Sequence, residues 1–122
     1  MLRASVLFCT AITAASIALH TATDAREASS QPHRIEVIAK KFAFVPSEIT
    51  LKRGQPVTLV LQSEDVLHGL RFKELGLDEE IRKGSPSEMS FTPDKTGTFV
   101  GRCSRFCGRG HGQMTLVLHV TE

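Results

Sequence analysis

The sequence predicts an all-β fold, a sandwich or barrel of about seven short strands. Apolar and polar residues alternate with a period of two over several stretches, and Gly and Pro turn signals separate these stretches at short intervals. No stretch has the length and period of a helix that joins two parallel strands. The 122 residues are 41% hydrophobic and 23% charged, as in an ordinary globular domain. We expect one domain with an N-terminal extension.

The N-terminal extension has the pattern of an export signal. Arg3 precedes an apolar, uncharged run at residues 6–19, and small residues follow it. We expect a cleaved signal peptide at 1–25; the alternative is an uncleaved anchor, although the run is shorter than the roughly 18 residues of a spanning helix. Residues 26–33 are polar and predict a flexible lead-in, so the folded domain is expected at 34–122. The protein is then exported, to the periplasm or the outer face of the cytoplasmic membrane.

Three strands are expected in the first half of the domain. Residues 34–44 alternate apolar and polar side chains, which predicts a strand that Pro46 ends. Residues 48–52 alternate again, up to the turn at 53–56. The β-rich apolar run at 57–61 is typical of a buried strand.

The second half predicts four more strands. His68 stands at the mouth of a loop that enters the next strand. Residues 75–81 predict a short helical turn or an irregular excursion. Two strands follow at 87–92 and 97–102, and the alternation at 114–120 predicts the closing strand. A Greek-key topology would bring the loop between the last two strands beside His68 at one end of the fold.

That last loop concentrates soft metal ligands. Cys103, Cys107, His111 and Met114 place two thiols, an imidazole and a thioether within twelve residues. Such donors suit copper better than magnesium, calcium or manganese. One Cys, the His and the Met, with His68 as a remote imidazole, would make a mononuclear blue-copper site, which leaves Cys103 without a role. Two thiolates can instead bridge two copper ions.

The segment 103–114 resembles the binuclear CuA loop, C-x-x-x-C-x-x-x-H-x-x-M, of cytochrome c oxidase subunit II and nitrous oxide reductase. Gly108 after the second cysteine and His68 upstream extend the resemblance, which covers roughly residues 34–122. It implies a Greek-key cupredoxin fold and a centre of two copper ions. The ligands that it implies are bridging Cys103 and Cys107, terminal His68 and His111, and the weak axial Met114 and main-chain carbonyl of Arg105.

The chain also departs from subunit II. Arg105 takes a position usually held by a glutamate whose side chain helps to hold a metal at the subunit interface. The family's tryptophan-bearing segment, through which electrons enter from cytochrome c, has no counterpart, because the chain contains no Trp and no Tyr. We also expect no room for the family's hairpin of two membrane helices. The resemblance therefore implies a CuA-like domain outside the context of a standard oxidase subunit.

The main rival to a metal site is a disulfide. Two nearby cysteines in an exported protein are often paired, and a Cys103–Cys107 disulfide is expected in an oxidised, copper-free form. A disulfide alone would not require His111 and Met114 at ligand spacing, so we favour metal. His33 and His119 are expected to be non-ligands and Met89 to be core.

The expected function is one-electron transfer. No Ser-His-Asp grouping, phosphate-binding loop or HExxH motif is visible, so we do not expect catalysis by the chain alone. It would be a free carrier or a module that feeds electrons to a respiratory oxidase or reductase; a copper chaperone or store is the alternative. Arg102, Arg105 and Arg109 around the loop suggest a redox partner with an acidic docking face. The net charge of +2 does not favour nucleic acid, and contact with a membrane is expected only through an uncleaved N-terminus or a membrane complex.

Overall fold

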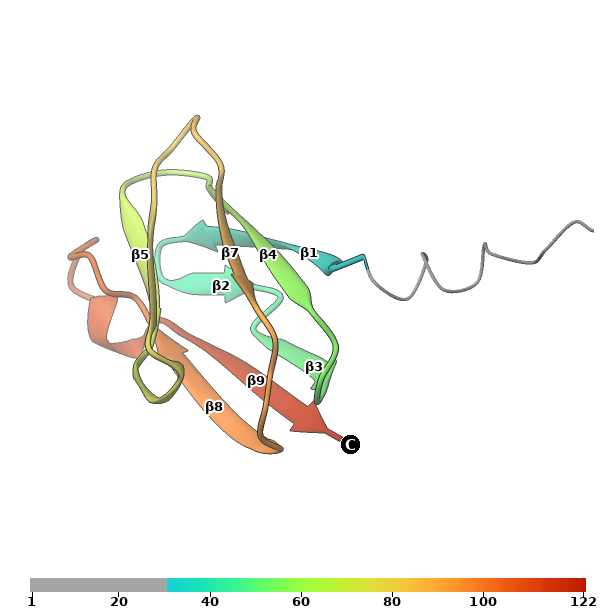
Figure 1. Ribbon diagram of the computed structural model, residues 1–122. Helices are drawn as coiled ribbons and strands as arrows, with labels where there is room; N and C mark the ends of the chain where they lie inside the picture. The colour runs from blue at the N-terminus through green and yellow to red at the C-terminus, as the bar shows by residue number, and fades with distance from the viewer. Residues whose placement is uncertain (1–30) are drawn as a thin grey trace, which may run out of the picture.

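The computed structural model describes residues 31–122, which form a β-sandwich (Figure 1). The predicted signal segment and most of the predicted lead-in lie outside the described residues. No helix in the described part is long and apolar enough to cross a membrane. In chain order the elements are β1 (His33–Lys40), β2 (Ala43–Val45), β3 (Glu48–Lys52), β4 (Val57–Ser63), β5 (His68–Phe72), the 3-10 turn η1 (Lys73–Leu75), β6 (Leu77–Ile81), β7 (Ser87–Phe91), β8 (Gly97–Arg102), the 3-10 turn η2 (His111–Gln113) and β9 (Thr115–Thr121).

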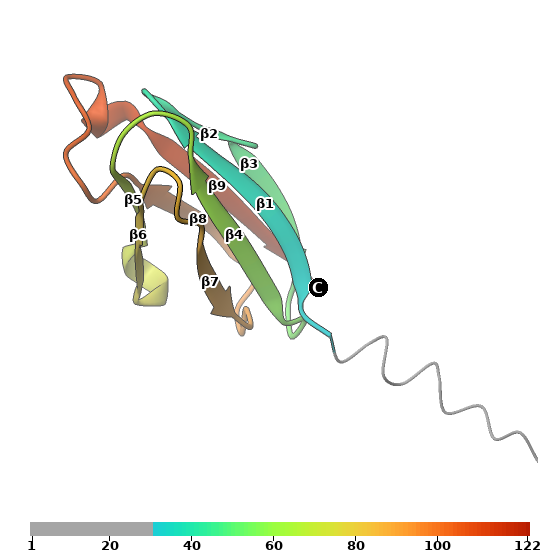
Figure 2. The same ribbon diagram turned by 90° about the horizontal axis from the view of Figure 1, so that it is seen from above.

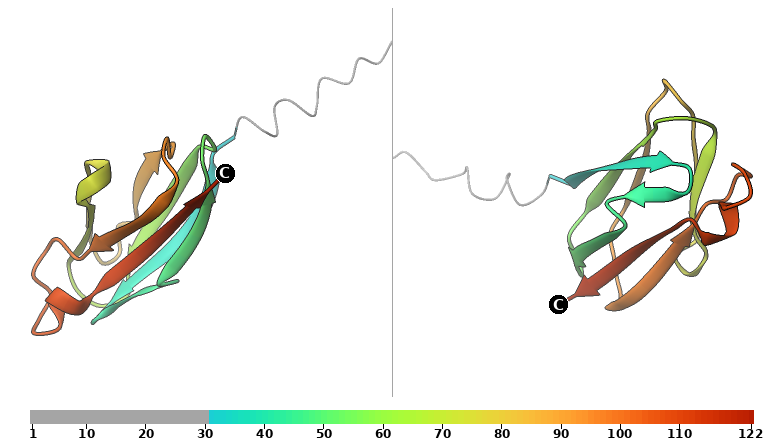
Figure 3. Two further views of the ribbon diagram at one scale, coloured as in Figure 1. Left: turned by 90° about the horizontal axis from the view of Figure 1, so that it is seen from below. Right: turned by 180° about the vertical axis from the view of Figure 1, so that it is seen from behind.

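Two sheets make up the sandwich, which confirms the predicted all-β fold. The first has the strand order β2-β1-β4-β7 and the second β3-β9-β8-β5-β6. β1 pairs in parallel with β4, and β3 in parallel with β9, while the other pairs are antiparallel. Figures 2 and 3 show the two layers, with the loop between β8 and β9 at the end of the sandwich away from the C-terminus.

The core lies between the two sheets, where alternate side chains of each strand point inward. β9 is an example, because Leu116, Leu118 and Val120 are buried whereas the residues between them are partly exposed. Met89 on β7 is buried in the core, as expected from the sequence. The fully buried members include Val37, Phe44, Leu59, Leu61, Leu70, Phe72, Ile81, Leu116 and Leu118.

The prediction of a helical turn or irregular excursion at 75–81 was wrong for most of that segment. The 3-10 turn ends at Leu75, and Gly76 follows it with a φ of 67°, a left-handed conformation that glycine adopts without strain. Residues 77–81 are β6, an edge strand that pairs antiparallel with β5. Pairing with β5 is a long-range interaction that a local pattern of charged residues does not reveal.

The first predicted strand is in fact two strands. β1 starts at His33, inside the predicted lead-in, and ends at Lys40. The chain then reverses, so that β2 pairs back on β1 with Phe44 opposite Ala39. Phe44 is buried but Phe42, in the turn, is 40% exposed. The alternation of apolar and polar residues continues from β1 through the turn into β2, because both strands bury side chains in the same core. The sequence pattern therefore looked like one strand.

Candidate metal centre

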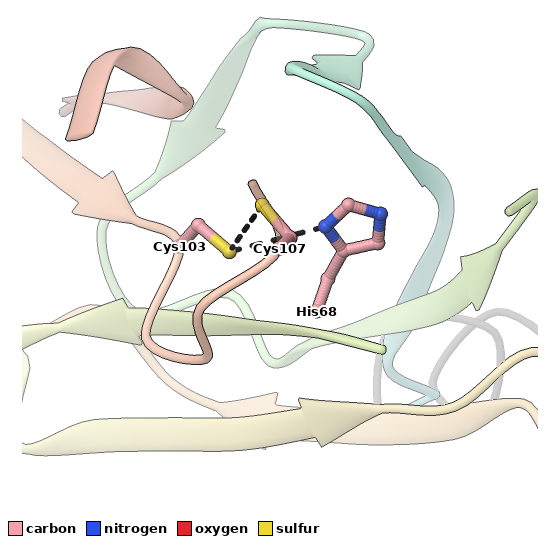
Figure 4. Close-up of side chains that lie close together, drawn as sticks. All are labelled: His68, Cys103 and Cys107. Carbon is pink, nitrogen blue, oxygen red and sulfur yellow. Dashed lines mark hydrogen bonds between the residues drawn. The ribbon is translucent and has the colours of Figure 1, made fainter. Parts of the chain in front are cut away.

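The predicted ligands meet at one end of the sandwich. His68 is the first residue of β5, Cys103 directly follows β8, and the remaining ligands lie in the loop that leads to β9. β5 and β8 are neighbours in the same sheet, so the start of one lies beside the end of the other. Figure 4 shows the side chains of His68, Cys103 and Cys107 turned toward one another. Their ligand atoms all lie within 4.8 Å of one another.

Each thiol has an imidazole of its own. Cys103 Sγ and Cys107 Sγ are 3.7 Å apart, and both cysteines are free. His68 Nδ1 lies 3.9 Å from Cys103 Sγ, and His111 Nδ1 lies 3.9 Å from Cys107 Sγ. The arrangement is therefore two sulfur atoms side by side, each with one nitrogen donor close to it.

Two weaker donors complete the cluster. Met114 Sδ lies 3.9 Å from Cys107 Sγ. The thiol of Cys103 donates a hydrogen bond of 3.1 Å to the main-chain carbonyl of Arg105. The structure thus brings together all six groups that the sequence proposed as ligands, whereas His119 lies elsewhere, beside Glu48.

The cluster is buried except at His111. His68 and Met114 are fully buried, and Cys103 and Cys107 are 5% and 6% exposed. Burial first, then the neighbouring Cys103 thiol and the Asp65 carboxylate, raises the pKa of the Cys107 thiol to about 11. Without metal this thiol is protonated at neutral pH, so a bound cation must displace its proton. Buried thiols, imidazoles and a thioether fit a soft metal such as copper.

Asp65 orients His68, a role that sequence reasoning missed. Its carboxylate lies 2.7 Å from His68 Nε2, which leaves Nδ1 facing the thiols. The backbone N–H groups of Lys41 and Val66 donate to the same carboxylate. Partial burial raises the pKa of Asp65, but these hydrogen bonds and the one to His68 outweigh it and lower the pKa to about 2. The sequence does place a carboxylate, Asp65, three residues before the proposed ligand His68, and this spacing could have indicated the contact.

We predict that Asp65→Asn lowers copper affinity by about tenfold or more, since partners that orient a ligand histidine commonly contribute that much. The measurement is a competition titration with a coloured copper chelator. Glu64→Gln is the matched control, because the exposed neighbour Glu64 undergoes the same loss of charge. Equal affinities in the two variants would contradict an orienting role for Asp65.

The ligand loop is held by close backbone contacts on two sides. Ser104 N donates to the carbonyl of Gly69 on β5 at 3.3 Å. A Cβ at position 69 would lie 2.2 Å from Ser104 Oγ, so glycine allows the loop to approach the strand. On another side the ring of Phe42 covers Gly110, where an added Cβ would lie 2.4 Å from the ring. These contacts fix the loop without using any of its donors.

Charged contacts also tie the loop to β6. Arg105 Nε lies 3.3 Å from Glu80 and its Nη1 lies 3.6 Å from Asp78. Ser104 Oγ donates to Asp78 at 2.7 Å. The sequence had indicated only an acidic surface at 78–80. Asp78 and Glu80 partly offset the charge of Arg105, although Arg71 and Arg82 share these two carboxylates.

Comparison with known proteins places this architecture in a recognised group. The family model described as "Cupredoxin-like domain" matches residues 8–116. Among solved structures, the periplasmic domain of cytochrome oxidase subunit II from Bradyrhizobium japonicum aligns with a TM-score of 0.68 and 20% identity, over 74% of this chain and 84% of that chain.

Two other similar structures are copper proteins of different kinds. The metal-binding domain of the Cu(I)-exporting ATPase CopA from Streptococcus pneumoniae has a TM-score of 0.60 and 23% identity, over 73% of this chain and 85% of that one. Auracyanin A, a "blue" copper protein from Chloroflexus aurantiacus, has a TM-score of 0.62 and 19% identity, over 75% of this chain and 100% of that one. The shared fold and the cluster of His68, Cys103 and Cys107 support copper binding.

Proposed function

The chain belongs to the cupredoxin-like domain family, and on that basis we propose that it is an exported copper protein that transfers single electrons through a binuclear, CuA-like centre. One observation carries the proposal. Two buried thiols lie 3.7 Å apart, and each has its own imidazole nitrogen at 3.9 Å. A pair of thiolates so placed can serve two metal ions at once, with one nitrogen donor for each.

Each donor of the cluster has a role in this proposal. In this proposal Cys103 and Cys107 would be thiolate ligands shared by both ions, His68 and His111 would each bind one ion, and Met114 and the Arg105 carbonyl would be weaker ligands. When bound, the copper pair would supply a reversible one-electron couple. The protein residues hold the donors in place: Asp65 orients His68, and the burial of Met114 and the thiols keeps water out. Donors fixed in this way rearrange little when the charge changes, which favours electron transfer.

The structure favours this function over the two alternatives. A mononuclear blue-copper site at Cys107 would leave the thiol of Cys103 buried beside it without a role. A copper chaperone needs a site that releases its metal readily. Here the donors come from β5 and from both ends of the β8–β9 loop, and most of them are buried. A carrier with a retained metal fits these features better.

The proposed setting is a redox chain outside the cytoplasmic membrane. The apolar run at 6–19 supports export, and the likeness to a periplasmic domain of an oxidase subunit agrees with it. We propose that the partner is another redox protein, either a soluble carrier or a respiratory oxidase or reductase. In the second case the catalytic chemistry belongs to the partner chain.

Copper reconstitution tests the proposed function directly. The reduced domain from residue 26 onward is loaded with copper, and the metal content and the paramagnetic resonance spectrum are measured. We expect two copper ions per chain and one unpaired electron whose hyperfine coupling is shared by both nuclei. One copper with a single-nucleus signal would contradict the binuclear centre. A retained Cys103–Cys107 disulfide without stable copper would contradict metal binding altogether.

A further inference from the structure

A groove of about 670 Å³ lies beside the ligand cluster on the outer face of the five-stranded sheet. We call it the Cys103 groove; Arg71, Lys73, Val100, Arg102 and Cys103 line it, together with Ser104 and Glu74. Three of these side chains are basic and one is acidic. The groove therefore carries an excess of positive charge at the place where a proposed metal ligand meets the surface.

Two of the three positive charges of the groove, those of Lys73 and Arg102, have no ion-pair partner within residues 31–122. Arg71 on β5 and Arg102 on β8 stand directly opposite each other across the two strands. Like charges in such a pair destabilise a sheet. Arg71 has Asp78 at 3.8 Å, but within residues 31–122 no carboxylate lies within ion-pair distance of Arg102 or Lys73. Arg105, in contrast, lies within ion-pair distance of two carboxylates of β6.

The groove also gives a short route to the buried cluster. Cys103 is 5% exposed, and its thiol lies 3.9 Å from His68 Nδ1 and 3.7 Å from Cys107 Sγ. The other exposed approach is through His111, whose ring is tilted at 47° against that of Phe106, 5.8 Å away. Phe106 is 80% exposed, so that approach is apolar at its tip. The two approaches differ in chemistry, as expected if they meet different partners.

We propose that the Cys103 groove is the docking surface for the acidic face of a redox partner protein, and that electrons pass between this partner and the cluster by way of Cys103. This inference rests on the proposed electron-transfer function. In each encounter one electron leaves the reduced protein and reduces one oxidised partner, or moves the opposite way. The charges of Arg102 and Lys73, which have no ion-pair partner within residues 31–122, attract carboxylates of the partner and orient it over the groove.

The first test uses two forms of one redox probe, native cytochrome c, which is basic, and succinylated cytochrome c, which is acidic and has the same haem. The reduced, copper-loaded protein is mixed with each ferric probe, and the rate of approach to equilibrium is followed by stopped flow. We expect the rate with the succinylated probe to fall with added salt. In Lys73→Gln/Arg102→Gln it should fall about tenfold at low salt, while the rate with native cytochrome c should not fall.

The matched control is Lys52→Gln/Lys95→Gln, which removes the same charge from exposed positions outside the groove. This variant should lose much less of its rate with the succinylated probe than the groove variant loses. Equal losses in the two double variants would mean that only net charge matters, and would overturn the proposed docking surface.

A second test needs no copper. In a Cys9→Ser/Cys107→Ser background Cys103 is the only thiol, since the chain has three cysteines. Its reaction rates with the anionic disulfide 5,5′-dithiobis(2-nitrobenzoate) and with uncharged 4,4′-dithiodipyridine are compared. Lys73→Gln/Arg102→Gln should lower the ratio of the anionic rate to the uncharged rate several-fold, because it removes positive charge that attracts the anion. A change in the intrinsic reactivity of the thiol affects both rates and cancels in their ratio.

This ratio separates the two proposals. An unchanged ratio would overturn the inference about the groove, whatever copper the protein binds. If the ratio falls but the unmodified domain binds no copper in the reconstitution experiment, the groove attracts anions and the proposed electron-transfer function is overturned instead.

Discussion

Cys103→Ser is expected to lower the copper content from two ions to one per chain, or to none, and to remove the hyperfine coupling shared by two nuclei. A serine hydroxyl is a hard, neutral donor that does not bridge copper ions as a thiolate does. The side chain of Cys103 is 5% exposed and lies 3.7 Å from Cys107 Sγ, so no other thiol within residues 31–122 replaces it. Metal analysis and paramagnetic resonance of the loaded variant give the result.

Cys107→Ser is the informative companion to this variant. A mononuclear site would depend on Cys107, next to His111 and Met114, and would survive the loss of Cys103. A binuclear site would fail in both variants. If Cys103→Ser binds one copper with an unaltered spectrum and Cys107→Ser binds none, the site is mononuclear and the binuclear proposal is wrong.

The second large effect is expected in the core. Phe72→Ala should lower the free energy of unfolding of the copper-free protein by about 3–5 kcal/mol, through lost burial and the cavity left behind. Phe72 is 1% exposed and ends β5, the strand that begins with His68. Urea unfolding followed by circular dichroism measures the change. Phe106→Ala is the matched control, because that ring is 80% exposed, and its effect should stay within about 0.5 kcal/mol.

A double-mutant cycle with Gly101 tests this packing further. A Cβ at Gly101 would lie 2.6 Å from the ring of Phe72, so Gly101→Ala alone should destabilise the protein by about 1–3 kcal/mol. Once the ring is removed by Phe72→Ala, most of that penalty disappears, although Leu70 Cδ1 would remain 2.9 Å away. We expect a coupling energy of about 1 kcal/mol or more. Additive effects would contradict the contact between ring and glycine.

The sequence predicted the fold and the ligand loop because both leave local traces. Alternation and turn residues located β3, β4, β7, β8 and β9 close to their observed bounds. The spacing of donors in the loop from 103 to 114 is likewise a local pattern. The ligand roles themselves stay predictions, since proximity of the side chains does not establish which metal they bind.

What the sequence did not reveal depends on contacts between distant segments. β6 is a strand because it pairs with β5, and the turn after Lys40 is held by the carboxylate of Asp65. Arg105 looked like a free charge beside the loop, yet it lies 3.3 Å from Glu80 of β6. The sequence also contains no sign that Arg71 lies near the ligand loop. Only the pairing of β5 with β8 places Arg71 opposite Arg102.

The position of β9 sets the order of events during synthesis. β9 follows Cys103 and Cys107 in the sequence, but it lies between β3 and β8 inside its sheet. β3 emerges early and pairs in parallel with β9, with Glu48 opposite Val117, so it waits for most of the domain before it gains its neighbour. Such long-range pairing forms late. Before β9 has paired, the loop that carries both thiols is not held beside His68, and we expect metal to be captured only after the whole domain has folded.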